Sequence, residues 1–478
     1  MKDKARSHWV ILTLLALAQF MVVLDSSIVN VALPAMQRAF SLSPANLQWI
    51  VTAYTLAFGG FLLLGGRAAD LYGRRKVFLA GVTVFAIASL LDGLAQSSGM
   101  LIGLRAVQGL AAAFMSPAAL SIVLITYKEG HERNIALSIW GAVAAGGAAV
   151  GVLLGGILTQ YLGWRWNFFI NIPIAAIVLV GAWKLVPKHE SEETHNDLDL
   201  PGAISVTAGL MLLVYGLVKA PSVGWTATST LVYLAGAVAL LVFFIVNEMR
   251  AKNPLMPLSI FKIRNITGAN LTQMPIAAAM FAVFYFTSIY VQEILHFSPI
   301  KTGLAYLPVP ITIAIAATNA PRLVKKVGYK KILMVAPLVI AAGMFMLGHV
   351  PEDGDYLTHV LPGLVVMALG AGFTFVSTTI AATSGVPGRE AGLASGLINT
   401  AQQVGGALGL AILSAVAAAS TSGFMHNSTD VPGGLVHGFH SAYYTAAFFA
   451  LGAALVATFV IKQQAKGAEG DAPAPAMH

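Results

Sequence analysis

Long apolar runs separated by short polar stretches dominate the pattern of this 478-residue chain. A helix that crosses the hydrocarbon core of a bilayer needs about 20 predominantly apolar residues. Fourteen apolar runs are close to that length. The pattern therefore predicts fourteen membrane-spanning helices, at residues 9–31, 48–66, 77–95, 100–125, 135–160, 168–186, 200–219, 228–248, 267–291, 302–320, 332–349, 359–384, 393–418 and 440–461.

The loops between these runs differ in charge from one side of the predicted membrane to the other. Most of the 28 lysines and arginines fall in alternate loops and in the two termini. The remaining loops hold only four of them, Arg38, Arg165, Lys219 and Lys301. Because cytoplasmic loops are enriched in Lys and Arg, we predict that both termini are cytoplasmic.

The composition agrees with a membrane protein. Charged residues make up 10% of the chain and hydrophobic residues 57%, whereas soluble domains carry about 25% charged residues. The net charge of +8 reflects the basic inner loops, so we expect no nucleic-acid partner. The chain has no cysteine, which excludes disulfides and thiolate metal sites.

A basic stretch, Gly66-Arg67-Ala68-Ala69-Asp70-Leu71-Tyr72-Gly73-Arg74-Arg75-Lys76, joins the second and third runs. Its cations predict a cytoplasmic loop, and its glycines allow a tight turn and close helix approach. Asp70 is the only acid in it. This carboxylate is placed to pair with Arg74, four residues later, or to cap the N-terminus of a nearby helix.

A looser copy of this stretch, Pro321 to Lys331, follows the tenth run, and its Gly328 matches Gly73. Such a repeat is typical of transporters built from two related halves. We therefore expect an N-terminal six-helix bundle, a polar linker with an inserted helix pair, a C-terminal six-helix bundle and a cytoplasmic tail, at residues 1–188, 189–252, 253–462 and 463–478.

The first predicted helix carries an acid, Asp25, about six residues before its predicted outer end. A carboxylate at this depth costs several kcal/mol unless it is protonated, paired or in a water-filled cavity. Because ionisable groups inside membranes usually mark substrate or proton pathways, we expect Asp25 to exchange a proton. The alternative is an acid that pairs with a neighbouring helix for packing only.

A cation, Arg105, lies about five residues inside the outer end of the fourth predicted helix. Since a helix rises ~1.5 Å per residue, its depth is similar to that of Asp25. A guanidinium keeps its proton in proteins and favours the ionised form of a nearby carboxyl group. We predict that Arg105 is the partner of Asp25, with a static ion pair as the alternative.

Four glycines, Gly147, Gly151, Gly155 and Gly156, follow one another at close spacing along the fifth predicted helix. Small residues of this kind allow a neighbouring helix to pack closely and to slide. The pattern fits a plain packing face and a face that moves during conformational change nearly equally well.

Taken together, these stretches resemble the fourteen-helix drug:proton antiporter branch of the major facilitator superfamily, and the resemblance covers nearly the whole chain. The segments that carry it are Leu24–Pro34, Gly66–Lys76, Leu104–Gly109, Gly147–Gly156, Trp164–Pro173 and Asn399–Gly406. One position departs from the family pattern: Val152 stands where the family has a proline. That departure puts the kink of the fifth helix, and its part in the direction of export, in doubt.

The resemblance implies an all-α membrane fold of two six-helix bundles with inverted repeats plus two inserted helices, working by alternating access. It implies that Asp25 is the coupling or substrate-contacting acid and Arg105 its partner. It also implies that Asp70 docks on the second bundle and stabilises one gate state. The residues that we assign to the gate are Gly66, Asp70, Gly73, Arg74, Arg75, Gly147, Gly151, Gly155 and Gly156.

Contacts to a lipophilic substrate are predicted in the second bundle, besides Asp25. The candidates are Gln273, Met280, Phe284 and Ser288 on one face of the ninth helix, Glu293 at its end, and Gln402 in the thirteenth. Packing explains the ninth-helix residues equally well. A solvated acid at the rim explains Glu293 better than a substrate contact does, and Asp92 near the outer end of the third helix is similarly ambiguous.

No metal, cofactor or enzymatic site is expected. Three histidines, His426, His437 and His440, fall in a predicted outer loop, but their spacing matches no familiar set of metal ligands. No His-Glu-x-x-His motif occurs, and an intramembrane enzyme would need such a motif or a nucleophile–base pair inside a span.

We therefore expect a monomeric, proton-coupled exporter of lipophilic small molecules, multi-pass in the inner (plasma) membrane of a bacterium. Because the second bundle has almost no acids within its spans, monovalent cationic or neutral substrates are favoured. The alternatives are an exporter or a proton-linked importer of one specific metabolite and, from another class, an intramembrane enzyme.

Overall fold

The computed structural model describes residues 2–127, 131–187, 198–384 and 388–463. The predicted linker at 189–197 and all but the first residue of the predicted tail at 463–478 lie outside the described residues. Within the described ranges, fourteen helices are long and apolar enough to cross a membrane, as the hydrophobic pattern predicts.

The first six spans lie in the N-terminal part of the chain. They are formed by α1 (Lys2–Phe40), α3 (Trp49–Tyr72), α4 (Arg74–Gly93), α5 (Ser98–Thr126), α6 (His131–Tyr161) and, as one span, α7 (Trp166–Phe169) with α8 (Asn171–Leu185). A single turn, α2 (Pro44–Leu47), precedes α3. An inserted pair, α9 (Leu200–Val223) and α10 (Thr228–Arg250), follows.

The last six spans are less regular. They comprise α11 (Arg264–Ile289) with η2 (Tyr290–Ile294), α12 (Pro299–Tyr306) with α13 (Pro308–Val327), α14 (Tyr329–Leu347), η3 (Tyr356–Val360) with α15 (Leu361–Thr383), α16 (Gly388–Met425) and α17 (Val431–Phe459). A short 3-10 helix, η1 (Leu258–Lys262), precedes them. The irregular turns in α11–η2 and η3–α15 lie at one end of the bundle.

Two predicted boundaries are wrong in ways that affect the site. The first helix continues past residue 31, through Pro34, to Phe40, since membrane helices tolerate a proline that costs one backbone hydrogen bond. Asp25 therefore lies near the middle of the first span and not about six residues from its end. The predicted loop at Gly66–Lys76 is helical on both sides of Gly73.

Gly73 alone makes the turn between α3 and α4. Its φ of 93° lies in a region that L side chains rarely adopt. Gly328, which matches Gly73 in the sequence repeat, makes the turn between α13 and α14 with a φ of 86°. The two positions thus share the backbone conformation that their match predicts.

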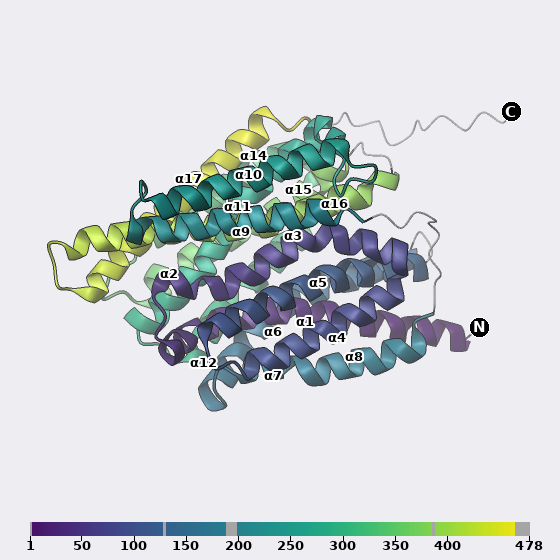
Figure 1. Ribbon diagram of the computed structural model, residues 1–478, viewed down its shortest axis with the longest axis horizontal. Helices are drawn as coiled ribbons and strands as arrows, with labels where there is room; N and C mark the ends of the chain where they lie inside the picture. The colour runs from purple at the N-terminus through teal and green to yellow at the C-terminus, as the bar shows by residue number, and fades with distance from the viewer. Residues whose placement is uncertain (1, 128–130, 188–197, 385–387, 464–478) are drawn as a thin grey trace.

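The inserted pair covers one side of the seam between the two groups of six helices (Figure 1). Helix α9 packs on α3 from the first group and on α16 from the last, and α10 packs on α9. The outward face of α10 carries exposed apolar side chains, among them Val232, Val238 and Phe243. Such a surface suits contact with lipid.

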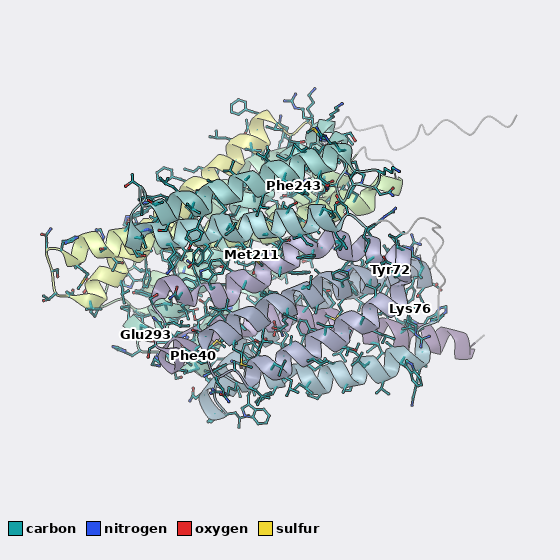
Figure 2. All side chains as sticks on the ribbon, viewed as in Figure 1. Phe40, Tyr72, Lys76, Met211, Phe243 and Glu293 are labelled. Atoms are coloured by element: carbon teal, nitrogen blue, oxygen red, sulfur yellow. The ribbon has the colours of Figure 1, made fainter. Side chains whose placement is uncertain are left out.

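Phe40 and Glu293 lie at one end of the helices, and Tyr72 and Lys76 at the opposite end (Figure 2). The charge pattern of the loops places the Lys76 end in the cytoplasm. We call the end with Phe40 and Glu293 the outer end and the other the inner end.

Candidate functional site

Asp25 and Arg105 form a buried ion pair in the first bundle, so Arg105 is the partner of Asp25 as predicted. Nη1 of Arg105 lies 2.6 Å from Oδ2 of Asp25, and the side chains of Asp25 and Arg105 are 0% and 1% exposed. The residues come from α1 and α5, which are far apart in sequence and packed together. Breaking a buried pair of this kind by removing one partner costs about 3–5 kcal/mol.

Two neutral amides complete the shell of the Asp25 carboxylate. Nε2 of Gln108 and Nδ2 of Asn171 each donate to Oδ1 at 2.9 Å. The same two amides donate to Oγ of Ser89, which in turn donates to the Phe168 carbonyl at 2.9 Å. One cation and two amides therefore donate to the carboxylate of Asp25.

The guanidinium of Arg105 is equally well enclosed. Its Nε donates to the Ile50 carbonyl at 3.1 Å, and Nη1 also donates to Oε1 of Gln108. The group lies over the ring of Tyr54, 4.2 Å from its centroid, which adds a cation–π attraction. Contacts from α3, α4, α5 and α8 therefore fix the pair at the centre of the first bundle.

The sequence did not assign a role to Gln108, Asn171, Ser89 or Tyr54. Gln108 was detectable, because it lies three residues after Arg105 and so shares its helix face. The approach of Asn171 depends on the way α8 packs against α1 and α4. No local pattern in the sequence predicts that packing.

Among the described residues, four hydrogen bonds join the two bundles at the outer end. Ser288 donates to the Asn30 carbonyl, and Gln292 donates to the Val31 carbonyl. Arg38 donates to Glu293, and the Ile300 amide donates to the side chain of Gln160. The exposed Arg38–Glu293 pair, at 2.7 Å, contributes about 0–1 kcal/mol. The buried contacts of Ser288 and Gln292, each to a backbone carbonyl of α1, hold the outer seam more strongly.

Two predicted substrate contacts, Ser288 and Glu293, lie in this closed seam or at its margin, and a third, Phe284, packs against Tyr306 of its own bundle. Ser288 is fully buried against α1, and Glu293 lies at the rim with its carboxylate on Arg38. Phe284 is half-buried, with its ring 5.3 Å from that of Tyr306.

The other predicted contacts lie deeper. Gln273 is 1% exposed, and neither its amide oxygen nor its nitrogen has a hydrogen-bond partner among the described residues. Met280 is buried in the main apolar core, and Gln402 on α16 is half-buried. An unpaired buried amide is costly, so of these residues Gln273 is best placed to receive a polar group.

The glycines of α6 contact two different partners. A Cβ at Gly147, Gly151 or Gly155 would meet α1 of the same bundle. A Cβ at Gly156 would lie 2.4 Å from the Pro299 carbonyl oxygen, at the start of α12 in the other bundle. Three of the four glycines therefore allow packing within the first bundle, and Gly156 lies in the seam between the two bundles.

Val152, which replaces the family's proline, is buried within an unbroken α6. A Cβ at Gly303 on α12 would lie 2.5 Å from the Val152 carbonyl oxygen. Nearer the inner end, a Cβ at Gly141 or Gly146 would meet no atom within 4 Å. Tight contact between α6 and α12 is thus concentrated toward the outer end.

The inner turn holds the remaining gate residues. Asp70 pairs with Arg74 at 3.1 Å, as its i,i+4 spacing suggests, and Arg75 donates to the Trp183 carbonyl. Both contacts stay within the first bundle. Gly66 is loosely packed, because a Cβ added there would lie 3.8 Å from its nearest neighbour, Cβ of Pro117. The docking of Asp70 on the second bundle stays a prediction.

The histidines of the predicted outer loop are placed differently by the structure. Helix α17 begins at Val431, so His437 and His440 are helical, and only His426 precedes it. His440 contacts the Val350 carbonyl through Nε2 at 2.7 Å. In the part of the chain that the structure describes, no three His, Asp or Glu side chains gather closely enough to hold a metal ion.

Comparison with known proteins gives concordant matches. The profile of the Major Facilitator Superfamily matches residues 15–410. The chain is 40% identical to the puromycin resistance protein pur8 of Streptomyces alboniger, over 94% of this chain and 90% of that protein. It is 38% identical to the cephamycin export protein CmcT of Amycolatopsis lactamdurans, over 86% of this chain and 85% of that protein.

Solved structures match in fold. The peptide transporter POT in complex with sulfate has a TM-score of 0.68 at 16% identity, covering 95% of this chain and 93% of that one. The xylose transporter XylE from E. coli has a TM-score of 0.65 at 15% identity, covering 96% of this chain and 97% of that one.

Proposed function

The chain belongs to the major facilitator superfamily, and from this premise we propose that it is a proton-coupled antiporter that exports lipophilic small molecules. It is a multi-pass membrane transporter and not an enzyme. Its all-α fold of fourteen apolar helices is the one that the sequence resemblance implied. Proton coupling, the exchange of substrate for protons and the site residues are the proposed part.

The buried Asp25–Arg105 pair is the observation that carries the proposal. A buried ion pair is often no more stabilising than apolar side chains of similar volume, so packing alone gives little reason for one in an apolar bundle. Proton exchange does give a reason, because a carboxyl group that alternates between a charged and a neutral form inside a membrane needs a cation to stabilise its charged form. We therefore assign proton exchange to Asp25 and the stabilisation of its charged form to Arg105.

The closed outer seam suggests where this conformation lies in the cycle. Asp25 is fully paired while the outer end is shut, and in the proposed cycle this is the arrangement reached after a proton has left toward the cytoplasm. Substrate then enters from the inner side. When the outer end opens, a proton neutralises Asp25, weakens its attraction to Arg105 and favours return.

The expected substrates are monovalent cationic or neutral lipophiles. The contacts predicted in the second bundle include two amides, Gln273 and Gln402, and two apolar side chains, Met280 and Phe284. Such a lining favours lipophilic molecules with few charges. The names of the relatives, which include antibiotic resistance and export proteins, support the same class. We place the protein as a monomer in the bacterial plasma membrane.

An efflux assay in cells tests this function. Cells that express the chain are expected to retain less of a lipophilic cationic dye or of puromycin than cells without it, and a protonophore should abolish the difference. Asp353→Asn, at an exposed loop position, is a control that should retain efflux. Efflux that survives complete collapse of the proton gradient would contradict proton coupling.

A further inference from the structure

A second buried acid in the first bundle, Asp92, has no hydrogen-bond partner among the described residues. Asp92 lies in the last turn of α4 and is 0% exposed. Neither of its carboxyl oxygens accepts a hydrogen bond from any residue that the structure describes. An ionised carboxylate without donors is strongly disfavoured in such surroundings, whereas the protonated form avoids most of that cost.

The charged groups that act on Asp92 belong to the site already described. Arg105 on α5 attracts its ionised form, and Asp25 on α1 repels it. Arg105 is the only ionisable residue of α5, and Tyr54 on α3 belongs to the same electrostatic cluster. The guanidinium of Arg105 therefore attracts both acids, and in this structure it donates its hydrogen bond to Asp25 and not to Asp92.

The remaining helices packed against α4 offer Asp92 no other cation. Helix α7 has no ionisable side chain, and Arg165 just before it donates to the Ala95 carbonyl. The single ionisable residue of α8, Lys184, lies in its last turn, at the end away from Asp92. The other ionisable residues of α3 and α4, from Arg67 to Lys76, lie at the inner end.

We propose that Asp92 is a second proton-carrying group, which holds a proton in this conformation and passes it to Asp25. This inference rests on the proposed function and deepens it. Asp92 is the penultimate residue of α4, at the outer end, so it lies on the outer side of Asp25, which is near the middle of α1. Asp92 is thus placed between the outer surface and the Asp25–Arg105 pair.

The transfer conserves charge. The proton leaves the Asp92 hydroxyl and binds a carboxylate oxygen of Asp25, which becomes neutral while Asp92 becomes negative. The Arg105 side chain then leaves the neutral Asp25 and pairs with the negative Asp92. Because Arg105 and two amides donate to Asp25 here, the step requires that shell to loosen. An intact shell therefore prevents a proton leak through the resting protein.

Infrared spectroscopy of the purified protein in lipid tests the protonation directly. The wild type is expected to show the C=O stretching band of a buried protonated carboxyl group at neutral pH. Asp92→Asn should lose this band, Asp92→Glu should restore one, and the exposed control Asp353→Asn should leave it unchanged. A band that persists unaltered in Asp92→Asn overturns the inference, whatever the transport activity.

The pH profile of transport tests the role. In Asp92→Asn we expect substrate binding from the inner side to be retained, and turnover near neutral pH to fall by about 10²-fold, a contribution typical of a positioned proton carrier. The pH dependence of turnover should also shift. If Asp92 were only structural, its loss would lower turnover without changing this pH dependence. If the wild type moves protons with substrate and Asp92→Asn has the same pH profile as the wild type, only the role of Asp92 is overturned. A wild type that moves no protons with substrate overturns the proposed function instead.

Discussion

Arg105→Leu is expected to abolish transport and to destabilise the first bundle. The substitution removes the cation from a fully buried carboxylate and leaves the Ile50 carbonyl and the Gln108 side chain without their donor. Loss of one partner of a buried pair costs about 3–5 kcal/mol. The free energy of unfolding in detergent and efflux in liposomes measure the two effects.

Two further variants separate charge from stability. Arg105→Lys keeps the charge but loses the planar group that lies over Tyr54 and bonds three partners, so we expect partial stability and strongly reduced transport. The double variant Asp25→Asn/Arg105→Gln removes both charges and is expected to regain most of the stability without coupled transport. Full transport by Arg105→Leu would contradict the role assigned to this residue.

Gly156→Val is expected to keep the outer seam from closing. Its Cβ would lie 2.4 Å from the Pro299 carbonyl oxygen and 2.9 Å from Cα of Ile300, and both are backbone atoms that cannot turn away. Overpacking of this kind costs about 1–3 kcal/mol, which shifts an equilibrium between two conformations about 5- to 150-fold. Because every cycle requires closure, we expect transport to fall by a similar factor.

Because the chain has no cysteine, introduced cysteines can be labelled selectively to measure the distance across the outer seam. Cysteines introduced at Arg38 and Glu293, whose side chains are in contact at the outer rim, can carry spin labels for a distance measurement. In the otherwise unaltered protein we expect a population at short separation, and in Gly156→Val a shift to longer separations. Gly103→Val is the matched control, since a Cβ there meets nothing within 4 Å. An unchanged distance distribution in Gly156→Val would refute this role.

The fold and the central ion pair could be predicted from the sequence because each leaves a signal along the chain. Span-length apolar runs and the uneven charge of alternate loops fix the number and direction of the helices. Asp25 and Arg105 are exceptional within apolar runs, and the cost of leaving either unpaired in lipid makes each the expected partner of the other.

The surroundings of the pair could not be predicted, because they depend on helix packing. Asn171 reaches Asp25 only because α8 packs on α1, and the orphaned state of Asp92 is visible only when its neighbours are known. Helix α1 extends through Pro34 to Phe40, beyond the predicted end at residue 31, because the helix accommodates the proline. The sequence places Ser288 and Glu293 on the same helix, but it does not predict that Ser288 is buried against α1.

The measurement that tests the central claim most directly is substrate-driven proton movement in liposomes that contain the purified protein. For the wild type, addition of a transported lipophile is expected to drive a proton flux in the opposite direction, and that flux should be absent in Asp25→Asn although the variant is folded and inserted. A proton flux of wild-type size in Asp25→Asn would contradict the account.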